Sequence, residues 1–340
     1  MDRKYDVITL GEILLRLSTP INGRLAQGDT LMKHLGGAEL NIASEIGQLG
    51  LNTAIISKIP TNLLAAFIKN QLNASRVSEN YLIEPHPAPS RVGIYYYEYG
   101  SYPRKPRVVY DRKHSSINNI EISDVPQTLF YNTRLFHTSG ITLGLGGKAQ
   151  DFAIHCIKEF KKQGTLISFD VNYRANLWTG EEARKCIETI LPYVDIFFCS
   201  EDTARLTFGK TGTINEIQKS FCEEYPISVV ASTERTVITP KKHNFTSIIY
   251  SAKNDTYYRE NPYNNIDVVD RIGSGDAYVS GALYGYLKHG DCQKALEYGN
   301  AMAAIKHSVI GDMVFTDLEE IDSIIKQHKN TSGYQSEMNR

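Results

Sequence analysis

Apolar and polar positions follow each other along this chain in a regular succession of short and long segments. The short segments are nearly continuous apolar runs, as strands buried on both faces of a sheet require, and the long ones repeat apolar residues at helical spacing. The runs are DVITL (6–10), TAIIS (53–57), LFHTSGITL (135–143), TLISFDVN (165–172) and DIFFCSED (195–202), and the helical segments are AELNIASEIGQLG (38–50) and KAQDFAIHCIKEFKKQG (148–164). This alternation predicts βαβ units, and hence a doubly wound α/β fold with a mainly parallel sheet covered on both faces.

One region departs from the alternation. RVGIYYYEYG (91–100) and RVVYDR (107–112) have strand character but are separated only by the turn-rich SYPRKP, which predicts an antiparallel pair. Exposed aromatic patches usually mark binding surfaces, so we expect a small β lid over the edge of the sheet. An ordinary surface hairpin is the alternative. The aromatic residues concerned are Tyr95, Tyr96, Tyr97, Tyr99 and Tyr110.

The stretch VDRIGSGDAYVSGALYG (269–285) is poor in charge and rich in small side chains. Ala277, Gly281 and Gly285 recur every four residues, so a helix here would present a smooth stripe on one side. Such a stripe lets a helix lie close to a neighbouring element.

The beginning of that predicted helix carries the most informative chemistry. Gly273 and Gly275 would form the turn into the helix, because glycine accepts positive φ and leaves the backbone open to a ligand. The free N–H groups of the first turn would then form an anion site beside the carboxylate of Asp276. The alternative is that Asp276 only caps the helix, which contributes about 1 kcal/mol.

The segment FDVNYRANLW (169–178) places polar side chains at the end of an apolar strand. Asp170, Asn172 and Arg174 emerge there, and the carboxyl ends of strands are where open α/β sheets bind ligands. A solvated surface loop is the alternative.

A double glycine precedes the predicted helix in LGGAELNIASEIGQLG (35–50). It ends at Gly37, and Asn41 lies in the first turns of that helix. Ligand contact and a tight turn with a capping amide explain this pattern equally well.

The glycine turn before Asp276 matches neither of two common phosphate-binding motifs. It lacks the Gly-Lys-Ser/Thr ending of a P-loop, and Tyr278 stands at the last glycine position of Gly-x-Gly-x-x-Gly. The turn also follows the polar segment PYNNIDVVDR, whereas a dinucleotide fingerprint follows a buried first strand. Dinucleotide binding is therefore disfavoured.

The overall composition limits the classes of binding partner that we expect for this protein. Lys and Arg total 37 against 38 Asp and Glu, a formal net charge of −1, so we expect no nucleic-acid partner and no membrane surface. The five cysteines form no Cys-x-x-Cys pair and the nine histidines show no metal-ligand spacing. Neither a long apolar N-terminal segment nor a membrane-length run occurs. We expect a cytoplasmic protein with free thiols.

Taken together, the motifs resemble the two signatures of the ribokinase-like (PfkB) carbohydrate kinases. The double-glycine helix and the Asp-Arg-Ile-Gly-Ser-Gly-Asp-Ala-Tyr helix carry the resemblance, which spans nearly the whole chain. Within that family, GEILLRL, GGAELN, RVVYDR, FDVNYR with its following Leu-Trp, and VDRIGSGDA are most similar to the 2-keto-3-deoxygluconate kinases. The resemblance implies one ribokinase-like domain at 1–328 with lid strands from about 13–35 and 89–115. The polar tail at 329–340 is predicted to be disordered.

The resemblance also implies ATP and Mg²⁺ as cofactors and a role for particular residues. Asp276 would be the general base, and the backbone N–H groups of Gly273, Ser274 and Gly275 would stabilise the transferring phosphoryl. Arg112 and Arg174 would hold the carboxylate of an acid sugar. The implied acceptor site is Gly37, Asn41, Tyr95, Tyr110, Arg112, Arg174, Asp276 and Asp312, and the implied nucleotide site is Asn172, Arg174, Thr233, Arg235, Gly273 and Gly275.

Three positions depart from the family pattern. Ser274 stands where most members have alanine, which leaves the backbone donors intact. Many members have Asn-x-x-Glu near Mg²⁺, whereas this chain has Ser200-Glu201-Asp202-Thr203, so the metal-organising residues stay unassigned. A glycine-rich nucleotide loop is replaced by ASTERTVITP (231–240), where Thr233 and Arg235 are the weaker candidates.

The resulting prediction is an ATP-dependent kinase that phosphorylates the terminal hydroxyl of 2-keto-3-deoxygluconate, in Entner–Doudoroff or uronate catabolism. Two rivals remain: another ribokinase-like sugar kinase of the fructokinase type, and a non-catalytic sugar- or nucleotide-binding regulator on the same fold. The lid strands could also pair between subunits and form a homodimer or a higher homo-oligomer.

Overall fold

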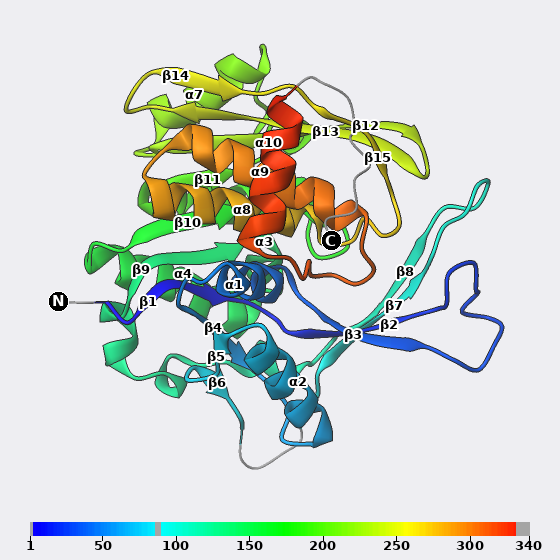
Figure 1. Cartoon of the computed structure of the whole chain (residues 1–340). Coiled ribbons are helices and arrows are strands. Elements are labelled where there is room, and N and C mark those ends of the chain that lie inside the picture. Colours follow the sequence, from blue (N-terminus) through cyan, green and yellow to red (C-terminus); the bar gives the residue numbers. More distant parts are fainter. Residues whose placement is uncertain (1–2, 86–89, 331–340) are drawn as a thin grey trace.

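A computed structural model describes residues 3–85 and 90–330. The chain forms a large sheet with helices on both faces and a second, smaller sheet that projects from one end (Figure 1). The strands of the large sheet are β1 (Tyr5–Leu10), β4 (Thr53–Lys58), β5 (Val77–Ser78), β6 (Leu82–Ile83), β9 (Thr133–Ser139), β10 (Leu166–Asp170), β11 (Ile196–Phe198), β12 (Val229–Thr239), β13 (Lys242–Ser251), β14 (Thr256–Arg259) and β15 (Tyr263–Asp267).

The large sheet is parallel except at one edge. Its order is β14-β13-β12-β11-β10-β9-β1-β4-β5, with β15 beside β13 and β6 beside β4. All neighbours from β12 to β5 pair in parallel, whereas β13 pairs antiparallel with β12, β14 and β15. The chain first builds outward from β1 to β4 and β5, then returns to β9 on the other side of β1. The predicted doubly wound α/β fold is confirmed, and its switch point between β1 and β9 is where such sheets bind ligands.

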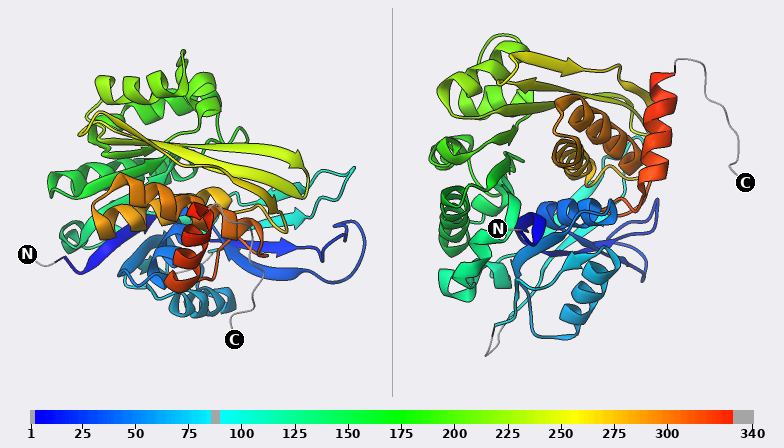
Figure 2. Two further views of the ribbon diagram at one scale, coloured as in Figure 1. Left: turned by 45° about the horizontal axis from the view of Figure 1, so that its top comes forward. Right: turned by 60° about the vertical axis from the view of Figure 1, so that its left-hand side comes forward.

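Helices cover the two faces as the predicted alternation requires (Figure 2). The helices are α1 (Ala38–Gln48), α2 (Leu63–Ala74), α3 (Gly140–Leu143), α4 (Gly147–Lys162), α5 (Gly180–Glu188), α6 (Glu201–Phe208), α7 (Ile214–Glu224), α8 (Ser274–His289), α9 (Cys292–His307) and α10 (Leu318–Lys329), with short 3₁₀ turns at Ser116–Asn119, Ile122–Asp124, Gln127–Tyr131 and Leu191–Tyr193. One core joins the sheet to α4–α7, and another joins it to α1, α8 and α9. Within β11, Phe197 packs in the first core and Ile196 and Phe198 in the second, since alternate residues of a strand face opposite sides.

Two apolar runs end as strands earlier than their sequence suggests. The run at 135–143 is a strand only to Ser139, whose hydroxyl accepts a bond from the N–H of Ile141 and begins α3. The run at 195–202 is a strand only to Phe198, because Ser200 caps α6. The polar residues that follow both strands therefore lie at the same edge of the sheet.

The small-residue stripe of α8 packs against α9 as predicted. A side chain at Gly281 would overlap the backbone oxygen of Tyr298, and one at Gly285 would overlap that of Lys294. The two helices therefore lie too close for larger residues at these positions.

The small sheet has the order β3-β2-β7-β8, with β2 (Leu14–Ser18), β3 (Met32–Gly36), β7 (Gly93–Glu98) and β8 (Arg107–Asp111). The predicted antiparallel pairing of β7 and β8 is confirmed. Tyr95, Tyr97 and Tyr99 are buried beneath the sheet, whereas Tyr110 on β8 is 41% exposed. Lys329 ends α10, and residues 331–340 of the predicted disordered tail lie outside the described residues.

None of the helices in residues 3–85 and 90–330 combines the length and apolar character that a membrane crossing requires.

Candidate active site

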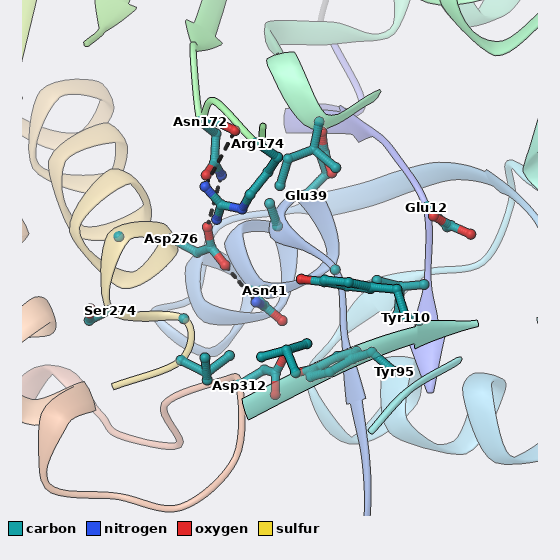
Figure 3. Close-up of a pocket in the computed structure, with 18 of the residues that line it drawn as sticks. Glu12, Glu39, Asn41, Tyr95, Tyr110, Asn172, Arg174, Ser274, Asp276 and Asp312 are labelled. Atoms are coloured by element: carbon teal, nitrogen blue, oxygen red, sulfur yellow. Dashed lines mark hydrogen bonds between the residues drawn. The ribbon is translucent and has the colours of Figure 1, made fainter. Parts of the chain in front are cut away.

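A cavity of about 520 Å³ opens between the carboxyl ends of the parallel strands, the small sheet and the N-terminus of α8 (Figure 3). Its position at the topological switch point agrees with the general rule for open α/β sheets. Its lining residues are Glu12, Leu14, Gly37, Ala38, Glu39, Asn41, Tyr95, Val108, Tyr110, Arg112, Ile141, Asn172, Arg174, Asn176, Arg235, Arg271, Ile272, Gly273, Ser274, Gly275, Asp276 and Asp312.

The N-terminus of α8 faces this cavity without a capping side chain. Gly273 is the N-cap, in left-handed conformation with φ 82°, and no side chain bonds to the first N–H groups. A side chain at Gly273 would overlap the backbone oxygen of Asp312, so only glycine fits. Asp276 is the third helical residue, and the reading that it caps the helix is wrong. Ser274 donates its N–H to the backbone oxygen of Arg271 over 3.3 Å, whereas the N–H groups of Gly275 and Asp276 bind no acceptor outside the helix within the described residues and can bind an anion.

The carboxylate of Asp276 lies in the cavity between two amides. Its Oδ2 accepts a 2.7 Å hydrogen bond from Nδ2 of Asn41, and its Oδ1 accepts a 3.5 Å bond from Nδ2 of Asn172 (Figure 3). Burial raises the pKa of Asp276 to about 6, although the bond from Asn41 opposes this shift. A carboxylate with this pKa accepts a proton near neutral pH better than an ordinary aspartate does.

Asn172 reaches Asp276 from a strained turn at the end of β10. Its φ is 37°, in the left-handed region that asparagine tolerates better than most residues, and its N–H donates to Oδ1 of Asp170 over 3.1 Å. Arg174 donates to the backbone oxygens of Asn172 and Tyr173, at 3.4 and 3.0 Å. Burial, and next the charge of Asp276, raise the pKa of Asp170 to about 7.

The predicted acceptor residues meet at the other end of the cavity, but Arg112 already has a partner. Its Nε donates to Oε2 of Glu12 over 2.8 Å, and its Nη2 bonds to the same oxygen. Glu12 is only 4% exposed and also accepts from the hydroxyl of Ser115. Sequence reasoning missed Glu12, and its only local signal is its place directly after β1, in GEILLRL. The guanidinium fork predicted to be free for a ligand is held by this carboxylate.

Gly37 and the two tyrosines shape the wall beside Arg112. Gly37 has φ 123°, and a side chain there would overlap the backbone oxygen of Glu12. The rings of Tyr95 and Tyr110 lie 5.8 Å apart between centroids. They form an aromatic wall at the small-sheet end of the cavity.

Asp312 lines the cavity, but both of its carboxylate oxygens bind protein groups. Oδ1 accepts from Nη1 of Arg16 over 2.9 Å, and Oδ2 accepts from the hydroxyl of Tyr95. Burial raises the pKa of Asp312, although the charge of Arg16 acts in the opposite direction. Asp312 is therefore held between the small sheet and the α8 turn.

A second cavity of about 200 Å³ adjoins the first. Gly275, Asn172 and Arg174 line both cavities, so they lie at the boundary between the two. The two nucleotide contacts predicted on β12 lie in different cavities: Thr233 lines the smaller one and Arg235 the larger one. ASTERTVITP lies mostly in strand β12, so no loop replaces the glycine-rich segment.

Glu39 and Arg271 are lining residues that sequence reasoning did not select. Glu39 is buried, its Oε1 accepts from the N–H and hydroxyl of Ser139 and from the hydroxyl of Thr142, and burial raises its pKa. Arg271 immediately precedes the glycine turn, and its charge lies near enough to Arg235 to lower the pKa of that side chain, after the effect of burial. Both lie inside motifs quoted above, Glu39 in GGAELN and Arg271 in VDRIGSGDA, but neither was given a role there.

The described residues show no group of three or more His, Cys, Asp or Glu side chains that could hold a metal ion. The segment 200–203 stands where many family members have Asn-x-x-Glu. In it, the hydroxyl of Ser200 accepts from the N–H of Thr203, and Glu201 forms a salt bridge with Arg205. Both motif ends, Ser200 and Thr203, line the smaller cavity.

Comparison with known proteins gives a consistent result. A model described as "pfkB family carbohydrate kinase" matches residues 4–317. The chain is 29% identical over 321 residues to a 2-dehydro-3-deoxygalactonokinase of Haloferax volcanii, covering 94% of this chain and 96% of that protein. It is 30% identical over 324 residues to an ATP-dependent 6-phosphofructokinase of Thermoanaerobacterium thermosaccharolyticum, covering 95% and 94%. The solved structure of a 2-dehydro-3-deoxygluconokinase from Thermotoga maritima matches with a TM-score of 0.90 and 31% identity, covering 96% of this chain and all of that one.

Proposed function

The chain belongs to the pfkB family of carbohydrate kinases and uses ATP, and we propose that its acceptor is 2-keto-3-deoxygluconate, phosphorylated on the terminal hydroxyl. This sugar is also called 2-dehydro-3-deoxygluconate, the acceptor named for the Thermotoga relative. The observation that carries the catalytic part is the carboxylate of Asp276 beside the uncapped N-terminus of α8.

Asp276 is the general base of this proposal. The hydroxyl proton of the acceptor passes to the carboxylate, the oxygen forms a bond to the γ-phosphorus, and the bond from that phosphorus to ADP breaks. Asn41 and Asn172 hold the carboxylate from two sides, which fixes its direction toward the cavity. A positioned base contributes roughly 10²- to 10⁴-fold to such a reaction.

The first turn of α8 stabilises the charge on the transferring phosphoryl. Gly273 and Gly275 offer backbone N–H groups, whereas the N–H of Ser274, the third predicted donor, already donates to the backbone oxygen of Arg271 over 3.3 Å. A side chain added at Gly275 would meet nothing within 4 Å, which leaves room for phosphate oxygens. Because Gly275, Asn172 and Arg174 border both cavities, the smaller cavity is the place proposed for the nucleotide. Thr233 lines it, whereas Arg235 would act from the acceptor side.

Mg²⁺ would neutralise charge on the phosphates of ATP. The described side chains form no carboxylate cluster for it, so most of its ligands would be phosphate oxygens and water, as is common for this ion.

The acid sugar is favoured by cationic groups at the cavity. Arg174, Arg235 and Arg271 line it and make no salt bridge to a carboxylate within residues 3–85 and 90–330. Arg112 binds Glu12 through Nε and Nη2, which leaves its Nη1 for a ligand. The guanidinium carbon of Arg112 lies 5.7 Å from the ring centroid of Tyr110. A sugar carboxylate would give these groups a counter-charge.

One observation favours a neutral acceptor instead. Glu12 binds the fork of Arg112, so the charge of this arginine is compensated before any ligand enters. A fructokinase-type specificity is therefore the second candidate. A non-catalytic regulator on the same fold would leave the base and the anion site without a use.

A coupled ADP-release assay over a panel of acceptors tests the proposal. The panel contains 2-keto-3-deoxygluconate, its galactonate epimer, fructose, fructose 6-phosphate and ribose, and ³¹P NMR identifies the phosphorylated position. We expect the highest kcat/KM with an acid sugar, with the phosphate on its terminal oxygen. Preference for fructose would support the second candidate, and no turnover with any sugar would support the regulator.

A further inference from the structure

Arg16 is a fully buried arginine on β2 that does not line either cavity described above. Its side chain is 0% exposed. Nη1 donates to Oδ1 of Asp312 over 2.9 Å, and Nη2 donates to Oδ2 of Asp270 over 2.5 Å and to the hydroxyl of Tyr99 over 3.0 Å. One guanidinium therefore joins the small sheet to two loops from the last quarter of the chain.

Both of these loops form the turn at the start of α8. Asp270 lies three residues before Gly273, and its Oδ1 accepts from the N–H of Ile272 over 3.1 Å. The backbone oxygen of Asp312 lies directly against the α-carbon of Gly273, where no side chain fits. The two carboxylates that bind Arg16 thus belong to the residues that fix the backbone of the glycine turn.

A second buried cation completes the cluster. Lys306, which is also 0% exposed, donates to the backbone oxygens of Asp270 and Val309, each over 3.1 Å. Two cations balance two carboxylates, Asp270 and Asp312, which are at most 4% exposed. Buried charges of this kind are tolerated only when each finds its partners, so the cluster has one favourable arrangement.

The cluster also reaches the acceptor end of the cavity. Asp312 accepts from the hydroxyl of Tyr95, which lines that cavity, and the guanidinium carbon of Arg16 lies 4.4 Å from the ring centroid of Tyr97. A continuous set of buried contacts therefore runs from the wall of the acceptor site to the α8 turn.

We propose that Arg16 is a positioning residue for phosphoryl transfer: it touches no substrate, but through Asp270 and Asp312 it sets the glycine turn so that the α8 N–H groups point at the transferring phosphoryl. The inference rests on the role given to α8 in the proposed function. A displacement of about 1 Å in such a site can cost roughly 10²-fold in rate.

Arg16→Met and Arg16→Lys test this role with the acceptor that the wild-type protein uses best. For Arg16→Met we expect kcat to fall by about 10²-fold while the dissociation constant of the acceptor, measured by calorimetry, changes less than about 3-fold. Arg16→Lys keeps the charge but loses the fork, so about 10-fold loss is expected. The affinity for ADP with aluminium fluoride, which mimics the transferring phosphoryl, should fall in proportion to kcat.

Phe221→Leu is the matched control, because Phe221 is buried in α7 and contacts neither cavity. It should lower the melting temperature without changing kcat. The inference is overturned if Arg16→Lys keeps wild-type kcat, or if the Arg16 variants lose no more kcat than Phe221→Leu at equal loss of stability. Should Arg16→Met fail to fold, Arg16→Lys decides by the same criterion. If Asp276→Asn retains turnover, the proposed general base fails instead, which separates the two claims.

Discussion

The two ends of the large cavity are built in different ways. At the α8 end, Gly273, Gly275 and Asp276 come from one contiguous motif, so the carboxylate and the free N–H groups are adjacent in sequence. At the small-sheet end, the groups work in pairs from distant segments, such as Glu12 with Arg112, 100 residues apart. The reacting groups of the phosphoryl-transfer site can thus be recognised in a local motif, although we propose that Arg16 positions its turn from a distant strand. The groups of the acceptor site meet only through tertiary contacts between side chains that no local pattern links.

Asp276→Asn, at the α8 end of the cavity, should have the largest effect on turnover. Turnover should fall roughly 10²- to 10⁴-fold, because the amide cannot accept the hydroxyl proton, while the affinity for ligands stays near that of the wild type. Steady-state kinetics and calorimetry measure the two quantities. Near-normal turnover would show that Asp276 is not the base.

The same variant should be more stable at neutral pH. The folded pKa of Asp276, about 6, lies above its ordinary value, so the folded state holds the proton more tightly than the unfolded one. Ionisation at pH 7 therefore costs stability, by up to about 3 kcal/mol for roughly two pKa units. Asparagine removes this cost, less about 1 kcal/mol for the one amide hydrogen bond that its NH₂ group cannot accept. Denaturant unfolding should show the gain at pH 7 and lose it below about pH 4.

Arg112→Leu, at the small-sheet end of the cavity, should have a smaller effect that is selective for the acid sugar. A hydrogen bond to a charged group contributes about 1.5 to 3 kcal/mol, so the KM for 2-keto-3-deoxygluconate should rise by roughly 10- to 100-fold. Activity on fructose should hardly change. Equal losses on both sugars would contradict the carboxylate contact.

Glu12→Gln sharpens that result, because the change removes the compensating charge and keeps Arg112. The KM for the acid sugar should then fall, whereas the variant Arg112→Leu raises it. A rise of KM with both variants would mean that the pair acts only as a structural unit.

Asn172→Gly should have the smallest effect. Glycine accepts the φ of 37° without strain, so stability should be kept, but the amide on Asp276 is lost. We expect a loss of kcat of about 3- to 10-fold. Asn172→Ala is the comparison, since it loses the amide and also keeps the strained backbone. An unchanged kcat in both variants would show that the amide of Asn172 does not contribute to catalysis.

The sequence was sufficient for the elements whose burial follows a local pattern. The parallel strands β1, β4, β9, β10 and β11 were predicted because strands buried on both faces form apolar runs, and the helices α1, α4 and α8 were predicted from their helical spacing. The antiparallel edge of β13, β14 and β15 was not predicted. β14 and β15 are polar, largely exposed strands without such a signal, and β13, although mostly buried, begins with the polar residues KHN. The partners of Asp312 were not predicted either. Arg16 lies 296 residues away in sequence, and no local pattern around either residue indicates that the two form a pair.

The pH dependence of kcat/KM, compared between the wild type and Asp276→Asn, tests the central claim most directly. Because the base must be ionised, wild-type kcat/KM should be constant above about pH 6 and fall about tenfold per unit below it, following the raised pKa of Asp276. In Asp276→Asn the residual activity should lack this acid limb. An unchanged limb in the variant, or a wild-type limb near pH 4, would contradict the assignment of Asp276 as the general base.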